Sequence, residues 1–254
     1  SPKMKRIVNR ILSKFGYQIS KIGPKLTLPA DIESNSTFME TYHLCGKFTM
    51  TSVYRMYALF QATGYISRHK IAGDVVECGI WKGGSAMMVA QTLVALSDVR
   101  RQIFLYDTYE GMPEPTDVDI DRLGRVARNK WNENQTENHN AWCYAPLDEV
   151  KSNLARTQYP LERLMFVKGK VEDTIPTTIP QQIALLRLDT DWYQSTYHEL
   201  THLFPLLVRG GIIIIDDYNH WQGQRKAVDQ YFSENNVQIA LVRIDKGGVI
   251  GVKQ

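Results

Sequence analysis

The feature of this chain that most constrains its fold is a regular alternation of short apolar strands with helices, from residue 74 to the C-terminus. The strands are predicted at residues 74–78, 102–107, 164–168, 183–189, 211–216, 239–244 and 248–252. The helices between them are predicted near residues 85–97, 148–157, 195–208 and 222–235. This spacing is typical of a parallel β-sheet with helices on both faces. The last two strands are joined only by Asp245-Lys246-Gly247-Gly248, which is too short for a crossover helix, so they must pair as an antiparallel hairpin.

The residues before this alternating part predict an N-terminal extension and one further helix. Residues 4–15 have the apolar spacing of an amphipathic helix with a basic polar face, residues 18–36 contain Gly23-Pro24 and Pro29 and predict a linker, and residues 50–66 predict a helix. We therefore expect a helical and linker extension over residues 1–47 and one domain over residues 48–254. The helix at 4–15 is expected to pack on the domain or on a second copy of the chain, as in a homodimer, in preference to a membrane surface.

Residues 110–147 interrupt the alternation. The segment is rich in Asp and Asn, and it contains Pro113, Pro115, Trp131 and Trp142. An insertion of this length in a compact domain is usually a lid or a binding loop, although a passive surface excursion is the alternative. The two tryptophans favour a lid.

Charge and cysteine content limit the class of protein. The net charge of +3 is too small to indicate nucleic acid as a partner. Cys45, Cys78 and Cys143 are scattered, odd in number and in no metal-binding pattern, which predicts a reducing compartment and a cytoplasmic protein. No apolar run approaches the ~20 residues that span a bilayer.

Residues 73–85 (GDVVECGIWKGGS) predict a strand that ends at Glu77, a glycine turn and the start of a helix. Such a junction lets a ligand approach backbone N–H groups closely. The spacing matches neither the dinucleotide-binding pattern nor the P-loop. It resembles the first motif of S-adenosylmethionine (SAM) methyltransferases, and an ordinary tight turn is the alternative.

Acidic residues stand at the ends of three predicted strands. Asp107 ends the second strand, Asp189 the fourth, and Asp216 and Asp217 the fifth. The carboxyl ends of parallel strands share one edge of the sheet, so the last three acids are expected to converge. A hard divalent cation would relieve their repulsion, and oxygen-only ligands favour Mg²⁺ or Ca²⁺ over zinc. Asp191 lies two residues after Asp189 and could take a proton or cap the following helix.

Five motifs in order, ECGIWKGGS, YDTYEGMP, EDTIP, LDTDWYQST and GGIIIIDDY, resemble the macrocin O-methyltransferase family, whose members methylate sugar hydroxyls. The resemblance runs from about Phe48 to the C-terminus. It implies a class I SAM methyltransferase fold, which is Rossmann-like α/β. Its seven-stranded sheet is mostly parallel with a C-terminal antiparallel hairpin, here with N-terminal helices and a lid insertion.

The resemblance also implies roles for residues that match the motifs. The SAM-binding positions are Thr49, Met50, Ser52, Glu77, Gly79, Ser85, Asp107, Thr108, Glu172 and Asp173. Among these, Ser85 would hydrogen-bond the methionine carboxylate, and Asp107 would accept hydrogen bonds from both ribose hydroxyls. Glu172 is a weaker match, because family members often have another residue there. The metal ligands would be Asp189, Asp216 and Asp217, and Asp191 would be the base.

The predicted activity is a metal-dependent methyl transfer from SAM to a hydroxyl of a small-molecule glycoside or polyol, with a vicinal diol favoured. Mg²⁺ is expected, with Mn²⁺ and Ca²⁺ as alternatives, because a cation lowers the pKa of a coordinated hydroxyl. Acceptor contacts are expected from aromatic and histidine side chains near the acids: Tyr193, Tyr218, His220, Trp221 and, from the insertion, Trp142. His220 is the rival base. Two alternatives are a cell-surface polysaccharide or glycolipid acceptor, with residues 4–15 as a membrane tether, and a non-catalytic SAM-binding module.

Overall fold

The computed structural model describes residues 28–254 and divides the chain into two compact units, Ser1–Asn35 and Ser36–Gln254. The described part of the first unit contains the short helix α2 (Ala30–Glu33), so the predicted linker is partly helical. Pro29 immediately precedes this helix, and Asp31 and Glu33 place negative charge in its first turn, which favours a helix there. The helix predicted at 4–15 lies outside the described residues.

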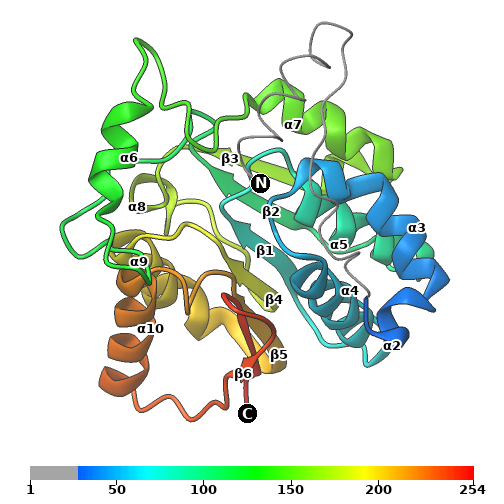
Figure 1. Ribbon diagram of the computed structural model, residues 1–254. Helices are drawn as coiled ribbons and strands as arrows, with labels where there is room; N and C mark the ends of the chain where they lie inside the picture. The colour runs from blue at the N-terminus through cyan, green and yellow to red at the C-terminus, as the bar shows by residue number, and fades with distance from the viewer. Residues whose placement is uncertain (1–27) are drawn as a thin grey trace, which may run out of the picture. The chain divides into compact units, whose positions relative to one another are not determined.

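The second unit contains a seven-stranded sheet in the order β3-β2-β1-β4-β5-β7-β6 (Figure 1). The strands are β1 (Asp74–Cys78), β2 (Ile103–Asp107), β3 (Leu164–Lys168), β4 (Ile183–Leu188), β5 (Leu207–Ile215), β6 (Val242–Arg243) and β7 (Val249–Val252). The first five strands are parallel, and β7 pairs antiparallel with both β5 and β6. The predicted fold class and the terminal hairpin are therefore confirmed.

The helices cover both faces of this sheet. Figure 1 shows α3 (Ser36–Cys45), α4 (Val53–Arg68), α5 (Gly84–Ala95) and α7 (Leu147–Leu154) on one face. The other face carries α8 (Val171–Thr174), α9 (Tyr193–Leu203) and α10 (Gln222–Glu234). The remaining helix is α6 (Ala127–Glu133), and single 3₁₀ turns lie at Gly46–Phe48, Ala155–Thr157, Leu161–Arg163 and Phe204–Leu206. Within residues 28–254, no helix is both long and apolar enough to cross a bilayer.

The largest differences from the sequence prediction concern the end of α9 and the strands β5 and β6. The helix predicted to reach residue 208 ends at Leu203, because Pro205 cannot continue an α-helix and a 3₁₀ turn follows. Strand β5 consequently begins at Leu207, earlier than expected. The sixth strand shrinks to Val242–Arg243, where both residues are exposed and form an edge.

The sheet positions the candidate site through its carboxyl edge. Residues that end β1, β2, β4 and β5 meet there, and the core behind them is apolar: Val76, Leu186 and Ile213 are fully buried. Helix α4 begins near the same edge, since Arg55 in its first turn lines the pocket there. Ser52 caps this turn by accepting a hydrogen bond from the Arg55 N–H. The rigid sheet thus holds the residues that follow its strands.

Candidate active site

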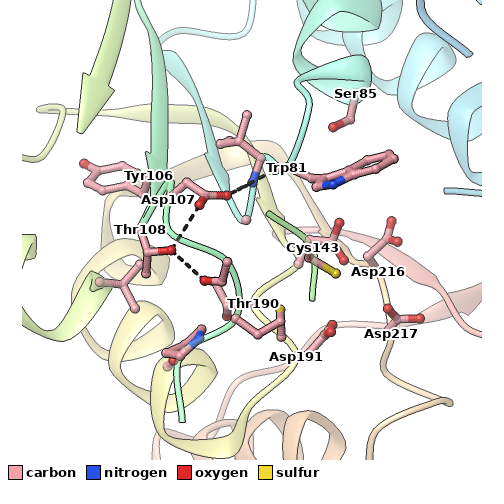
Figure 2. A pocket seen from close by; sticks show the side chains of 18 of the residues that line it. Trp81, Ser85, Tyr106, Asp107, Thr108, Cys143, Thr190, Asp191, Asp216 and Asp217 are labelled. Carbon is pink, nitrogen blue, oxygen red and sulfur yellow. Dashed lines mark hydrogen bonds between the residues drawn. The ribbon is translucent and has the colours of Figure 1, made fainter. Parts of the chain in front are cut away.

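A pocket opens at the carboxyl edge of the sheet, and Figure 2 shows part of its lining. Most of the predicted site residues line it: Thr49, Met50, Gly79, Ser85, Asp107, Thr108, Glu172, Asp189, Asp191, Asp216 and Asp217. In Figure 2, Asp107 and Thr108 lie on one side of the pocket, and Asp191, Asp216 and Asp217 lie on the other. The sulfur of Cys143 lies between these two groups.

The glycine turn after β1 requires a residue without a side chain at its first position. Gly79 has φ +86°, and a Cβ atom there would lie 2.3 Å from the carbonyl oxygen of Asp189. Only glycine tolerates both the positive φ and this close approach. The turn therefore packs directly against the residue that follows β4.

Asp107 holds the same turn through its carboxylate. One oxygen accepts hydrogen bonds from the N–H groups of Ile80 (2.7 Å) and Trp81 (3.1 Å), and the other accepts from the Tyr109 N–H (2.7 Å). Burial raises the pKa of Asp107 even though these three hydrogen bonds act in the opposite direction. The Thr108 hydroxyl also donates to the second oxygen, at a longer 3.5 Å, so this is the contact that a ligand hydroxyl in the pocket could replace.

Glu77 lies behind the pocket wall. It is buried, and it accepts hydrogen bonds from the Ser85 hydroxyl and from the guanidinium of Arg187. Ser85 itself lines the pocket. Glu77 thus fixes the orientation of a residue that a ligand can touch.

Asp189, Asp191 and Asp217 form the tightest acidic group among the described residues. One carboxylate oxygen from each lies within 4.8 Å of the others, a spacing that could hold a metal ion. Asp191 has φ +70°, which is strained for a residue with a side chain, and its buried Oδ1 has no hydrogen-bond partner. Burial raises the pKa of Asp191 well above its usual range, and the neighbouring carboxylates Asp217 and Asp189 raise it further.

The carboxylate of Asp216 is engaged differently. Its Oδ1 lies 2.7 Å from Nη2 of Arg187, and its Oδ2 pairs with Arg55 and accepts from the Thr51 hydroxyl at 3.3 Å. The structure thus groups Asp191, rather than Asp216, with Asp189 and Asp217. Asp216 contacts both guanidinium groups, whereas Asp189 pairs with that of Arg187 and Asp217 with that of Arg55.

These two arginines are components of the site that sequence reasoning missed. Arg187, the residue before the last in β4, is 2% exposed and pairs with Glu77, Asp189 and Asp216. Burial alone would lower the pKa of Arg187, but the three acids hold it well above the usual range. An arginine inside the apolar run ALLRLD was the available signal, since a buried charge needs partners.

The expected acceptor-binding side chains are absent from the lining of this pocket. The Tyr193 hydroxyl donates to Gln230 (2.8 Å), and the Tyr218 hydroxyl donates to Asp229. Trp142 and Trp221 pack with the fully buried Trp192, with ring centroids 5.0–6.0 Å apart, and the His220 ring lies 5.0 Å from Trp221. Ser52, Glu77 and Asp173 also lie outside the lining.

Other side chains supply the apolar part of the lining. Trp81 follows the glycine turn, and Met112, Pro113 and Cys143 come from the insertion. Trp81 and Cys143 both have positive φ values, of 46° and 56°. The sequence prediction placed aromatic contacts next to the acids. In the structure, the apolar lining of the pocket comes from the glycine turn and from the insertion.

Comparison with known proteins gives consistent matches. Residues 41–252 match the macrocin-O-methyltransferase (TylF) family model. A mycinamicin III 3''-O-methyltransferase of Micromonospora griseorubida is 31% identical over 245 residues, which are 96% of this chain and 93% of that protein. A demethyldecarbamoylnovobiocin O-methyltransferase of Streptomyces niveus is 31% identical over 202 residues, or 79% of this chain and 74% of that protein.

Solved structures agree with these matches. The O-methyltransferase NovP has a TM-score of 0.71 and 28% identity, with 82% of each chain covered. A methyltransferase of Podospora anserina, solved with S-adenosylhomocysteine bound, has a TM-score of 0.54 at 13% identity over 92% of this chain and all of its own. The second likeness is one of fold alone.

Proposed function

Because this chain belongs to the macrocin O-methyltransferase family, we propose that it methylates a sugar hydroxyl of a glycosylated small molecule with the help of a divalent cation. Membership of the family makes the chain an O-methyltransferase with SAM as methyl donor. The acceptor, the cation and the role of each residue are the proposal. The observation that carries it is the group of acids that lines the same pocket as the glycine turn and Asp107.

The turn and Asp107 form the proposed SAM site. The absence of a side chain at Gly79 allows close approach of the donor, and a ribose hydroxyl could replace the long Thr108 contact of Asp107. Ser85, held by Glu77, would meet the methionine carboxylate, and Thr49 and Met50 line the mouth of the same pocket. Ser52 and Asp173 are left out of direct contact in this proposal.

The acid group fits a divalent cation. The donors are carboxylate oxygens only, which suits Mg²⁺, and a buried oxygen of Asp191 lacks any partner. A bound cation would supply Lewis-acid stabilisation of negative charge on the acceptor hydroxyl. Asp189 and Asp217 would hold it, and Asp216, the third ligand expected from the resemblance, would have to exchange an arginine contact for the cation.

Asp191 is the proposed base. It lies beside Asp189 and Asp217, so its unpartnered oxygen would be close to the acceptor hydroxyl whose proton must leave. Its neighbour Trp192 is buried, which holds the backbone of Asp191 in place. His220 does not line the pocket and is therefore the weaker candidate.

Two matched variants separate the roles of base and ligand. D191N should keep the affinity for Mn²⁺ and SAM and lose about 10²–10⁴-fold in kcat, the usual contribution of a general base. D216N should weaken Mn²⁺ binding, measured by electron paramagnetic resonance. If D191N loses Mn²⁺ affinity and D216N does not, then Asp191 is a ligand and the base role is wrong.

The acceptor class is supported by relatives whose names describe methylation of glycosylated natural products, including a rhamnosyl-tetracenomycin 4'-O-methyltransferase of Streptomyces olivaceus. The test is a screen with methyl-labelled SAM over macrolide, aminocoumarin and polyketide glycosides, their aglycones, simple catechols and a polysaccharide. The proposal predicts label on the sugar of one or more glycosides. Label only on the aglycone hydroxyls, the catechols or the polysaccharide would contradict it.

A further inference from the structure

We propose that Asp119, in the insertion, is a positioning residue that sets the geometry of the acidic group. This inference rests on the proposed function for its catalytic consequence. The insertion, residues 110–147, lies beside α9 and α10 (Figure 1). These two helices follow β4 and β5, the strands that precede the acids.

Asp119 is fully buried and binds the start of α9. Its Oδ2 accepts hydrogen bonds from the N–H and hydroxyl of Thr116, both at 2.7 Å, which closes a turn within the insertion. Its Oδ1 accepts from the N–H of Tyr193 at 2.8 Å. Tyr193 is the first residue of α9 and lies two residues after Asp191, so a carboxylate from the insertion satisfies a helix N-terminal N–H next to the acidic group.

The same carboxylate also touches α10. A Cβ atom at Gly223 would lie 2.0 Å from Oδ1 of Asp119, so the first turn of α10 packs directly on this oxygen because residue 223 is glycine. One buried side chain therefore contacts the N-terminal turns of both helices. These turns follow Asp191 and Asp217 in the chain, and they fix the spacing of the two loops that carry the acids.

Two further contacts join the insertion to the same loops. The indole N–H of Trp192 donates to the carbonyl of Pro113 at 2.9 Å, and the Gln222 N–H donates to the carbonyl of Ile120 at 2.9 Å. Trp192 directly follows Asp191, whose φ of +70° is a conformation that surrounding contacts must maintain. The insertion thus contacts both residues that follow Asp191. Trp192 donates to the carbonyl of Pro113, and Tyr193 donates to the carboxylate of Asp119.

Asp119 acts through other residues, since it does not line the pocket. Part of the insertion, which the sequence predicts to be a lid, is hydrogen-bonded to the starts of α9 and α10. Loss of the anchor should let the Asp191 loop relax and spoil the arrangement of Asp189, Asp191 and Asp217. The fold itself should survive, because the hydrogen bonds of Asp119 lie outside the large apolar cluster around the sheet.

The matched control is Asp121, in the same insertion and only 3% exposed. Its carboxylate bonds stay within the insertion, to the N–H groups of Leu123 and Arg125 and to the Arg125 side chain. D119A and D121A therefore each remove a buried carboxylate that accepts three hydrogen bonds. Only D119A removes the hydrogen bond from Tyr193.

Hydrogen exchange over residues 189–196, measured without ligands, tests the positioning role independently of catalysis. D119A should accelerate exchange there at least about tenfold, as expected when a buried hydrogen bond to a charged group is lost, and D121A should leave it within about twofold. Equal exchange in D119A and wild type would overturn the inference. If D119A does not fold, D119S serves instead, because its hydroxyl is one atom shorter than the carboxylate and should no longer reach the Tyr193 N–H, and an unchanged exchange rate in D119S would count equally against the inference.

Activity supplies the second readout. D119A should lower kcat about 10- to 100-fold and weaken Mn²⁺ binding, with the Kd for SAM nearly unchanged, because a shift of about 1 Å at reacting groups has effects of this size. D121A should lower the melting temperature and keep kcat. A fall in kcat for both variants in proportion to their stability would contradict a positioning role. A wild-type protein that binds no Mn²⁺ and methylates no glycoside would instead refute the proposed function and leave the exchange result to decide on Asp119.

Discussion

The buried guanidinium of Arg187 should contribute a large share of the stability of this fold. R187M keeps an unbranched, apolar side chain of similar length near the carboxyl end of β4. It leaves the carboxylates of Glu77, Asp189 and Asp216 without the cation that all three contact. Removal of one partner from a buried ion pair costs about 3–5 kcal/mol, because the remaining charge stays desolvated. For a domain of this size, that loss corresponds to a fall in melting temperature of roughly 6–20 °C.

Guanidinium chloride unfolding of wild type, R187M and R225M, followed by circular dichroism, measures this effect. R225M is the control: Arg225 is 58% exposed and pairs with Asp229, which is 53% exposed, and an exposed pair is worth about 0–1 kcal/mol. A loss below about 1 kcal/mol in R187M, or equal losses in the two variants, would refute the argument that three acids depend on one buried cation.

Two further predictions follow from backbone geometry and from burial. G79A should abolish SAM binding in calorimetry and destabilise the fold, because its methyl group would meet the Asp189 carbonyl at 2.3 Å; G124A, with φ +80° but no atom within 4 Å, should cost only about 1 kcal/mol of strain and bind SAM normally. Equal behaviour of the two variants would show that the close approach at Gly79 is unimportant. The Cys143 thiol should react slowly with iodoacetamide at pH 7–9, since burial first, and the Asp191 and Asp189 carboxylates next, raise its pKa and keep it protonated over that range. Mass spectrometry of the labelled peptide measures the rate, and rapid labelling at pH 7.5 would contradict this assignment.

The sequence predicts the sheet well because strand signals were strong and local. Buried parallel strands read as short apolar runs, and a four-residue link leaves only a hairpin for the last two strands. The end of α9 was less predictable, because its apolar spacing continues through Phe204 and Leu206 into β5 although Pro205 stops the helix. Weak periodicity similarly hid the short length of β6.

The acids were predictable for a different reason. Asp107 ends β2, Asp189 directly follows β4 and Asp217 lies two residues after β5. The carboxyl ends of these strands share one edge, so topology alone brings the three acids to one pocket. The direction of each side chain does not follow from topology. Asp216 and Asp217 are adjacent in the chain, yet Asp216 pairs with two arginines and Asp217 joins Asp191.

The insertion and the acceptor wall were the least predictable parts. Residues 110–147 have no periodicity, and the burial of Asp119 depends on Tyr193 and Gly223, which lie far away in the sequence. Tyr193 and Tyr218 were close to the acids in sequence, but the hydroxyl of Tyr193 from α9 and that of Tyr218 from the turn after β5 both donate to α10 side chains. Proximity in sequence was therefore a poor guide to which aromatic residues line the pocket.

The central claim is that a divalent cation in the acidic group activates a sugar hydroxyl for methylation by SAM bound at the glycine turn. Its most direct test measures SAM affinity and methyl transfer to a glycoside on the same wild-type sample, first in EDTA and then with Mg²⁺ restored. The account predicts SAM binding in both conditions, because neither the glycine turn nor Asp107 belongs to the acidic group that would hold the cation. It also predicts transfer only with Mg²⁺. Full transfer in EDTA would contradict it.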